Sequence, residues 1–594
     1  MIYRENSGRL TIGMRDEGKL LTRTRGGDDS RVLVCNTSNG IWYQMKMMDH
    51  DGTIWSKSSL IPAYLGLYLL VFVTSLEAQV TLNLVVFAAS AFNAHSLIST
   101  IFVVQSVVFS VAKPIIAKVA HVFGRFEAFT LCIALLILGY STSAASNGIQ
   151  MFTVSSVFYS AGATGLQILQ QIFIADTSNL QNRALLSTIP DVPFLANVWI
   201  GAPLASTLLD GPGWRWGYGI WAIVLPVTFI PLASSLLRER YKLRNTTIET
   251  SLFRKPSLKS LWYELDAGGL LLLTAAICLI LIPLTLVSNG QGDAVDGLDK
   301  AMLVCGFLFL GAFPLWERSA RLAPHPFFPP HLSRNRSVLA GFGIAFLFTM
   351  AYYLSVFPYF QSYLLVVKDE SITTAGYIVQ IYVFVSTVTA IVVSILIKFV
   401  RRYRLFVASG SCIYCLGVVF TAISRTEKAG SAIIVASQVI IGLGGGLLVV
   451  PAQLGVQASV DQSEVASTTA LFLAMLEIGA AVGSSISGAI WRSNVLSKLQ
   501  QYLPADTSDQ ALEIFGNLTL ASTGWPDGSP TKTAIARSYQ ETMNKMMLVA
   551  ACTCIPLVPL SLLMENHKLD EVCLVAMSLT CQYSDHGTLA RQTD

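Results

Sequence analysis

Charged residues are scarce in this chain. Asp, Glu, Lys and Arg make up 13% of its 594 residues, against about 25% in soluble proteins, while hydrophobic residues make up 53%. This balance excludes a soluble enzyme and a disordered chain. The formal net charge of +4 is too small to indicate a nucleic-acid partner.

Several sequence patterns are also missing. No apolar core lies near the start, so no cleavable signal peptide is expected. No GxxxxGK[ST] pattern occurs, which disfavours transport driven by ATP. No His/Cys cluster has metal-ligand spacing, and nothing points to covalent catalysis, so we predict neither a bound cofactor nor an enzyme. Most of the ten cysteines fall in apolar segments, where Cys behaves as a small hydrophobe, and this excludes a disulfide scaffold.

Long apolar runs dominate instead. Residues 268–287 and 375–397 contain no charge, and about 20 residues at 1.5 Å rise cross a 30 Å hydrocarbon core. The chain is therefore predicted to be an all-α polytopic membrane protein. Its fourteen predicted spans are 61–91, 96–116, 127–145, 150–175, 184–209, 215–236, 265–287, 301–316, 338–362, 373–397, 405–424, 431–455, 466–491 and 544–563.

The basic residues predict the orientation. Residues 238–262 hold seven Lys and Arg and residues 398–404 hold four, whereas residues 288–299 are acidic. Because Lys and Arg concentrate in cytosolic loops, both termini are expected in the cytosol. The long polar connection 493–541 is then outside, where Asn517 begins a glycosylation sequon.

An internal repeat suggests the domain organisation. Ser155-Ser-Val157 followed by Gly162 and Gly165 has a counterpart about 280 residues later, in Ser437-Gln-Val439 and its following glycines. Parallel repeats of six helices are typical of major-facilitator transporters, so we expect two six-helix bundles with two inserted helices. The predicted units are a disordered cytosolic tail 1–58, a first bundle 59–236, an insert with its cytosolic loops 237–336, a second bundle 337–564 and a cytosolic tail 565–594.

The connection after the second predicted span resembles the inter-helix motif of that superfamily. In that motif, a small residue, an Asp, a Gly and basic residues lock the two bundles together at the cytosolic face. Glycine permits the tight turn, but His121 stands where the motif has Asp, so this lock lacks a fixed anion. The predicted motif residues are Lys113, Lys118, His121, Gly124 and Arg125.

Longer stretches resemble the fungal siderophore-iron transporters, and the resemblance runs from about residue 55 to residue 568. The stretches are 90–97, 113–125, 175–183, 359–364, 457–459 and 483–491. The resemblance implies fourteen spans and uptake of ferric siderophores with protons. The iron would be carried inside the siderophore, so the protein itself would need no cofactor. We expect a monomer in the lipid bilayer of the plasma membrane, with an endosomal or vacuolar membrane as the alternative.

Acidic residues inside predicted spans are candidates for proton coupling. A carboxyl at membrane depth costs roughly 2.5–3.5 kcal/mol on insertion scales, so such a residue is a functional candidate by default. Burial also lets a carboxyl hold a proton at ambient pH. The candidates are Glu77, Asp191 and Glu477. Asp176 and Arg183, around the next cytosolic turn, are a candidate gating pair, with helix-end charges as the alternative interpretation.

Amide and aromatic side chains in the spans are candidates for binding the substrate. Buried amides need hydrogen-bond partners, and a neutral ferric hydroxamate offers them. The candidates are Phe87, Gln105, Gln167, Gln170, Gln171, Tyr363, Tyr377, Gln380 and, in the outer connection, Tyr539. Two other functions remain open: a fourteen-helix drug:proton antiporter, and a sensor that binds siderophore without transport. Residues 197–206 keep Gly201 and Pro203 of the antiporter pattern but not its full glycine set.

Overall fold

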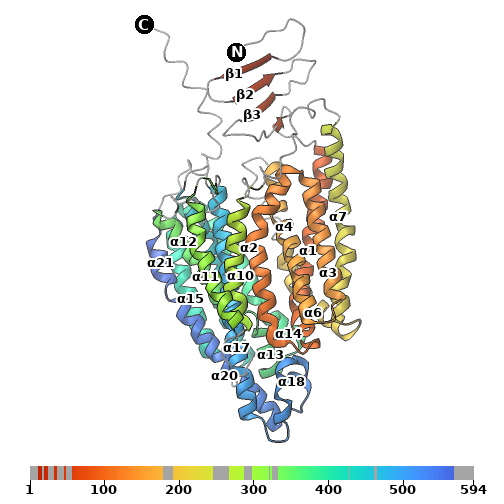
Figure 1. Cartoon of the computed structure of the whole chain (residues 1–594), viewed down its shortest axis with the longest axis vertical. Helices are drawn as coiled ribbons and strands as arrows, with labels where there is room; N and C mark the ends of the chain where they lie inside the picture. The colour runs from red at the N-terminus through yellow and green to blue at the C-terminus, as the bar shows by residue number, and fades with distance from the viewer. Residues whose placement is uncertain are drawn as a thin grey trace.

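Helices dominate the computed structural model. It describes residues 11–15, 19–23, 32–36, 46–48, 57–177, 192–244, 262, 266–286, 297–319, 321–323, 332, 334–426, 429–460 and 465–566. The long helices run roughly parallel to the long axis of the molecule (Figure 1). Lipid offers the backbone no hydrogen-bond partners, whereas a helix pairs its own N–H and C=O groups. The apolar segments therefore form helices.

Within the part of the chain that the structure describes, six helices form the first bundle. α1 packs against α6 and α7, α3 packs against α4 and α7, and α2 packs against α4. Their bounds are α1 (Lys57–Ala91), α2 (Ile98–Val122), α3 (Arg125–Ala144), α4 (Ile149–Thr177), α6 (Val192–Asp210) and α7 (Trp214–Arg244).

The second bundle repeats this arrangement. α15 packs against α16, α14 against α16, and α12 against α17 and α20. Its helices are α12 (Arg336–Ser355), α13 (Phe360–Val367), α14 (Ile372–Val400), α15 (Arg404–Ser424), α16 (Ser431–Gln457), α17 (Val465–Tyr502), α20 (Pro530–Cys554) and α21 (Leu557–Leu563).

Glycines explain the internal repeat. A Cβ on Gly162 of α4 would lie 2.8 Å from the backbone carbonyl oxygen of Cys132 in α3. Gly444 of α16 stands in the same relation to α15, since its Cβ would lie 2.4 Å from the backbone nitrogen of Tyr414. Both helix pairs therefore approach too closely for a side chain, and the repeated glycines mark equivalent contacts.

Two further helices lie outside both bundles. α10 (Ala267–Leu286) packs against α2 and α17, while α11 (Gly297–Glu317) packs against α10 and is mostly exposed. Val103, Ile277 and Ala481 share one buried apolar cluster, so α10 covers the line where the two bundles meet. Figure 1 shows the pair at the front, between α12 and α2.

The number of spans is supported in part. Among the described residues, twelve helices are long and apolar enough to cross a membrane. α4 and α10 coincide with the two remaining predicted spans; α4 is less apolar than the twelve, while α10 is apolar over its 20 residues. The all-α membrane fold is confirmed, and the count of fourteen stays a prediction.

Some boundaries differ from the sequence prediction. The span predicted over 338–362 is two helices, α12 and α13, separated by a turn over residues 356–359. α20 begins at Pro530, well before the predicted residue 544, because Ser529 caps it and Pro530 suits the first helical position. Much of the predicted outer connection is therefore helical.

That connection also contains short helices. They are η4 (Ser508–Gln510), α18 (Ala511–Gly516) and α19 (Leu518–Thr523), and η1 (His95–Leu97) joins α1 to α2. α18 lies at the end of the molecule opposite the strands β1 to β3 (Figure 1). The sequence predicts this end to be outside the cell.

Four short strands precede α1, in the segment predicted to be a disordered tail. They are β1 (Thr11–Arg15), β2 (Lys19–Arg23), β3 (Val32–Asn36) and β4 (Lys46–Met48), and they pair antiparallel in sequence order. The predicted domain boundaries stay predictions.

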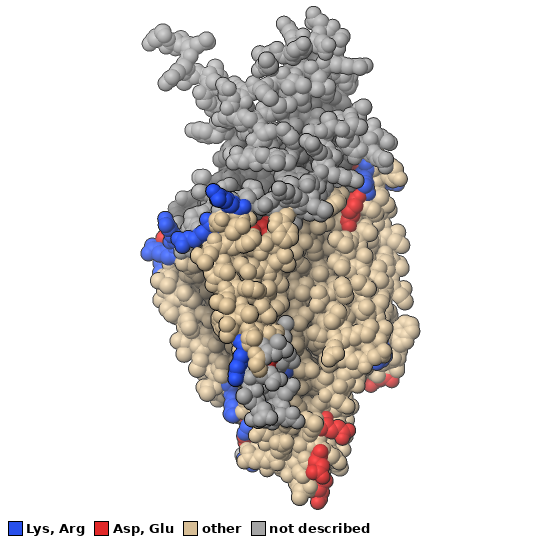
Figure 2. Space-filling model, viewed as in Figure 1, with Lys and Arg blue, Asp and Glu red and all other residues tan. Residues whose placement is uncertain are grey.

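The surface fits a membrane protein. Figure 2 shows a broad band without charged residues across the middle of this face. Lys and Arg gather near the upper end and along one lower edge of this view, and Asp and Glu gather near the lower end. The uncharged band is the surface expected to contact lipid.

Candidate functional site

The two bundles meet along two lines. On one, α2 packs against α17, and on the other α6 packs against α14. Trp199 of α6 contacts Tyr377 and Phe384 of α14, with ring centroids 5.6 and 5.3 Å apart. Between these lines, Gln361 of α13 donates a hydrogen bond of 3.3 Å to the Asn83 side chain of α1.

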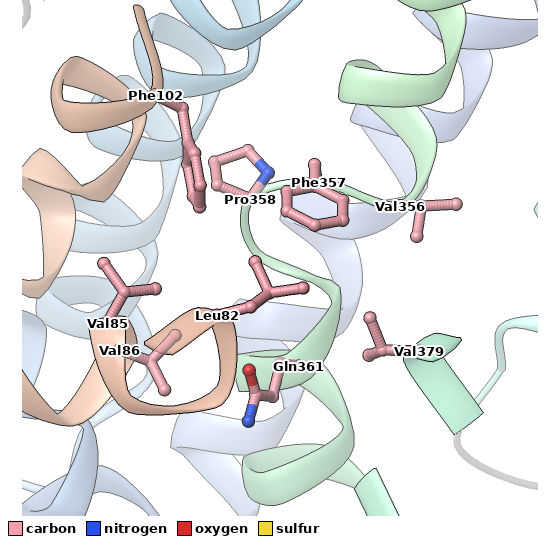
Figure 3. Close-up of a pocket in the computed structure, with 9 residues that line it drawn as sticks. All are labelled: Leu82, Val85, Val86, Phe102, Val356, Phe357, Pro358, Gln361 and Val379. Atoms are coloured by element: carbon pink, nitrogen blue, oxygen red, sulfur yellow. The ribbon is translucent and has the colours of Figure 1, made fainter. Parts of the chain in front are cut away.

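A small cavity lies between the bundles, with a volume of about 10 Å³, which is room for about one water molecule. Figure 3 shows its nine lining residues, of which eight are apolar and the ninth is Gln361. They come from α1, α2, the turn between α12 and α13, α13 and α14. Sites for drug-sized ligands usually measure about 300–1,000 Å³, so this cavity is too small to hold one.

Polar and aromatic side chains join the two bundles at the end predicted to be outside. The His95 Nε2 atom lies 2.8 Å from the Ser362 hydroxyl. The Tyr359 hydroxyl donates to the Ser96 carbonyl at 2.9 Å and lies 3.3 Å from the Ser99 hydroxyl. We call His95, Ser96, Ser99, Tyr359, Ser362 and Trp491 the outer gate.

Trp491 anchors the outer gate from α17. Its ring stacks on that of Tyr359, with centroids 4.1 Å apart and planes 1° apart, and lies 6.1 Å from that of His95. The next residue, Arg492, is only 2% exposed, and its two terminal nitrogens have no hydrogen-bond partner. Gly488 lets α17 approach α2, since a Cβ there would lie 2.7 Å from the Ser99 Cβ. The gate is thus a tightly packed contact that contains a buried cation.

An ion pair joins the bundles deeper in the molecule. The Lys113 Nζ atom of α2 lies 3.3 Å from a carboxylate oxygen of Glu477 in α17. The side chains are 10% and 23% exposed. The structure thus brings together a residue predicted for the cytosolic motif and one predicted for proton coupling. Protonation of Glu477 would remove the charge that pairs with Lys113, so this pair can link a proton to the contact between the bundles.

Glu77 lies inside the first bundle and is 3% exposed. Its carboxylate accepts a hydrogen bond of 3.0 Å from the Thr81 hydroxyl. The phenol groups of Tyr140, Tyr159 and Tyr218, which come from α3, α4 and α7, lie near it. A buried carboxyl among hydroxyl groups can take up and release a proton without a fixed partner cation. The third candidate, Asp191, lies outside the described residues.

The predicted substrate residues do not form one site. Gln380 is 2% exposed and its amide nitrogen has no partner, while Tyr363 donates to the Gln540 side chain at 2.9 Å. Phe87, Gln105 and Tyr377 are partly buried, Gln170 is buried, and Gln167 and Gln171 are exposed. Tyr539 is not a free loop residue: it is fully buried in α20 and packs edge-on against Trp491. Their roles stay predictions.

The predicted cytosolic motif lies mostly within a helix. α2 continues to Val122, so only Phe123 and Gly124 form the turn, and Gly124 has a positive φ of 107°. Glu127, at the start of α3, forms an ion pair with Arg240 of α7. The side chains of Lys118, His121 and Asp176 and the whole of Arg183 lie outside the described residues. The gating pair therefore stays a prediction.

The outer connection reaches from the second bundle to the first. The Leu518 amide donates to the Ser90 hydroxyl at 3.1 Å, and a Cβ on Gly516 would lie 2.4 Å from the Asn93 carbonyl oxygen. Asn517 accepts from the Leu520 amide and so caps α19. The connection thus adds to the contacts that hold the outer end closed.

Five residues of these contacts were not predicted from the sequence as site residues: His95, Ser362, Tyr359, Arg492 and Asn83. Four of them lie in or next to stretches that resemble the fungal transporters, 90–97, 359–364 and 483–491. A polar residue within such a stretch was the available signal. Their pairing across some 260 residues of chain leaves no local pattern.

Two bundles that meet around a small central cavity define the class of protein. Residues 67–484 match the family described as Major Facilitator Superfamily, and the chain belongs to it. The crystal structure of a bacterial homologue of the human lysosomal transporter Spinster, inward-facing and unoccupied, aligns over 86% of this chain and 97% of its own with a TM-score of 0.55. At 14% identity this likeness shows the fold alone.

Within the superfamily, the chain belongs to the siderophore iron transporters and is no enzyme. It is 50% identical to the MFS siderochrome iron transporter C of Aspergillus fumigatus over 94% of this chain and 92% of that protein. It is 46% identical to the siderophore iron transporter mirC of Emericella nidulans, over 95% and 94%. Siderophore iron transporter 1 of Schizosaccharomyces pombe is 35% identical, over 83% and 80%.

Proposed function

We propose that this chain imports ferric siderophores together with protons, by alternating access of its two bundles. The observation that carries this proposal is the Lys113–Glu477 ion pair, which joins the bundles where they must part. A transporter in which the closed contact contains a titratable acid can link protonation to opening. The relatives' names supply the substrate class.

The interior favours a ligand of the hydroxamate type. Asn83, Gln361 and Gln380 present amide groups close to the contact between the bundles, and an amide needs a polar partner when it is buried. A ferric trihydroxamate offers carbonyl and hydroxamate oxygens, and its iron is already fully coordinated. Among the described residues no cluster of His, Cys, Asp and Glu could hold a metal. The protein would therefore recognise the organic shell, with the iron as cargo and no cofactor of its own.

Concentrating a nearly neutral ligand requires a driving ion. Protons are the natural choice, since Glu77 is a buried carboxyl in the first bundle and Glu477 a partly buried one in the second. We place the protein as a monomer in the plasma membrane, where an inward proton gradient and external siderophores meet.

The test is accumulation of radiolabelled iron by cells that express the chain and lack other siderophore uptake. A panel of ferric hydroxamates and one ferric catecholate is supplied at equal concentration. We expect uptake against the gradient for at least one hydroxamate, abolished by a protonophore. Lower internal iron than in control cells would indicate an exporter, and saturable binding without accumulation would indicate a sensor.

A further inference from the structure

His95 is a buried titratable residue that the proton pathway proposed above does not use. It lies in η1, between α1 and α2, and is 0% exposed. Its ring faces Tyr359 and Trp491, with centroids 6.0 and 6.1 Å away, so the first bundle inserts an imidazole between aromatic groups of the second. The hydrogen bond to Ser362 is its link across the outer gate.

The hydrogen bonds of this site suit a neutral ring only. A neutral imidazole has one donor nitrogen and one acceptor, whereas a protonated ring has two donors. Nε2 is shared with the Ser362 hydroxyl, which can donate or accept, and Nδ1 is buried with no partner. In a protonated ring both nitrogens carry a hydrogen. Nε2 can donate to the Ser362 hydroxyl, but the charged N–H group at Nδ1 would have no acceptor. Such a group strongly disfavours the closed contact.

The surrounding charges add to this effect. α17 contributes Arg492, a buried cation next to Trp491, while the turn before α13 and α20 contribute the phenols of Tyr359 and Tyr539. α18 carries Glu513, which is exposed to solvent, and the neighbouring ends of α1 and α2 contribute the neutral Asn93 and Ser99. Among the described residues, no carboxylate pairs with His95. A positive imidazole would therefore be buried without a counter-charge.

We propose that His95 is the proton-responsive residue of the outer gate: a proton from the outer side breaks the contact between the bundles, and its loss lets the gate re-form. Acid outside then favours the outward-open state, which is the state that must receive substrate. This role is separate from that of Glu77 and Glu477, which would carry the driving proton across. It rests on the alternating access of the proposed function, but not on the identity of the ligand.

The experiment measures opening of the gate directly. Ser96 is 9% exposed, and its carbonyl rather than its hydroxyl holds Tyr359, so Ser96→Cys places a thiol in the closed gate with little disturbance. A membrane-impermeant maleimide is applied to cells that carry the full chain, at outer pH values from 7.5 to 5. Leu512→Cys, at an exposed position in α18, reports the pH dependence of the reagent itself. The measured quantity is the ratio of the two labelling rates, after subtraction of the labelling of the parent chain.

We expect this ratio to rise as the outer pH falls, by up to roughly tenfold per pH unit, the limit for one linked proton. In His95→Gln, whose amide can still bond Ser362 but cannot titrate here, the ratio should be independent of pH. Ser362→Ala weakens the closed gate and keeps the imidazole, so its ratio should be higher at every pH and still rise in acid.

Three outcomes would overturn the proposal: a flat ratio in the parent chain, a ratio that still rises in His95→Gln, or a flat ratio in both variants. The last would mean that the response needs only an intact contact. The reporter needs no siderophore, so a chain that imported nothing could still show the response. Conversely, siderophore uptake together with a labelling ratio that does not change with pH would overturn only the role of His95 and leave the proposed function standing.

Discussion

At the scale of single residues, the position of Glu477 links the chemistry of the site to the movement of the bundles. Its carboxylate and the Lys113 ammonium group are partly shielded from water and belong to different bundles. Removing one partner of a buried pair leaves the other charge uncompensated, which costs about 3–5 kcal/mol. We therefore expect Glu477→Gln to lower the thermal stability of the detergent-solubilised protein and to abolish concentrative uptake.

The double variant Glu477→Gln with Lys113→Met separates the two effects. Stability should return to near that of the parent chain, since no lone charge remains, while uptake stays lost. Arg336→Gln is the matched control, because its pair with Glu565 is exposed and worth about 0–1 kcal/mol. Uphill uptake in the double variant would show that this pair is not needed for coupling.

Glu77 is the second residue with a defined outcome. Its carboxyl lies within the first bundle among Thr81 and three tyrosines, and Gln retains its shape and its hydrogen bond to Thr81. In Glu77→Gln we expect siderophore binding to persist and concentrative uptake to collapse. The remaining flux should no longer depend on external pH. Uptake with the parent pH dependence would instead direct attention to Asp191 and Glu477.

At the scale of helices, close contacts at glycines determine how the elements pack. A Cβ on Gly444 of α16 would lie 2.4 Å from the backbone nitrogen of Tyr414 in α15, so backbone rather than a flexible side chain would have to move. Overpacking of this kind costs about 1–3 kcal/mol. Gly444→Ala should therefore lower the thermal stability clearly. Gly311→Ala in α11, where a Cβ meets nothing within 4 Å, should leave it unchanged or slightly higher.

The sequence predicted the helices better than it predicted their ends. Apolar runs located them, because length and hydropathy suffice to mark a membrane helix. The break between α12 and α13 escaped, since residues 338–362 are apolar throughout and no charge marks the turn. The early start of α20 escaped for the opposite reason: its first turns are polar and owe their helix to Ser529 and to packing on α17.

A site residue could be predicted only where its own place in the sequence marked it, without knowledge of its partner. A carboxyl inside an apolar run marks Glu77 and Glu477 directly. The partner of Glu477 could not be found in this way, because Lys113 lies 364 positions earlier and was assigned to a loop. His95 and Ser362 are ordinary polar residues whose meaning depends on contact between the two bundles.

At the scale of the whole molecule, the orientation in the membrane is the first test. Lys and Arg predict that α18 and α19 face outward, and Asn517 caps α19 at a partly exposed position. We expect a glycosidase-sensitive mass shift that disappears in Asn517→Gln. Protection of residues 503–529 from protease added to intact cells would contradict this orientation.

The central claim is that protons drive uptake through two alternating bundles. Purified protein is reconstituted into sealed liposomes, and entry of a radiolabelled ferric trihydroxamate is followed with and without an inward proton gradient. The account predicts accumulation above the external concentration only with the gradient, abolished by a protonophore and absent in Glu477→Gln. Equal uptake with and without the gradient, or unchanged accumulation in Glu477→Gln, would contradict it.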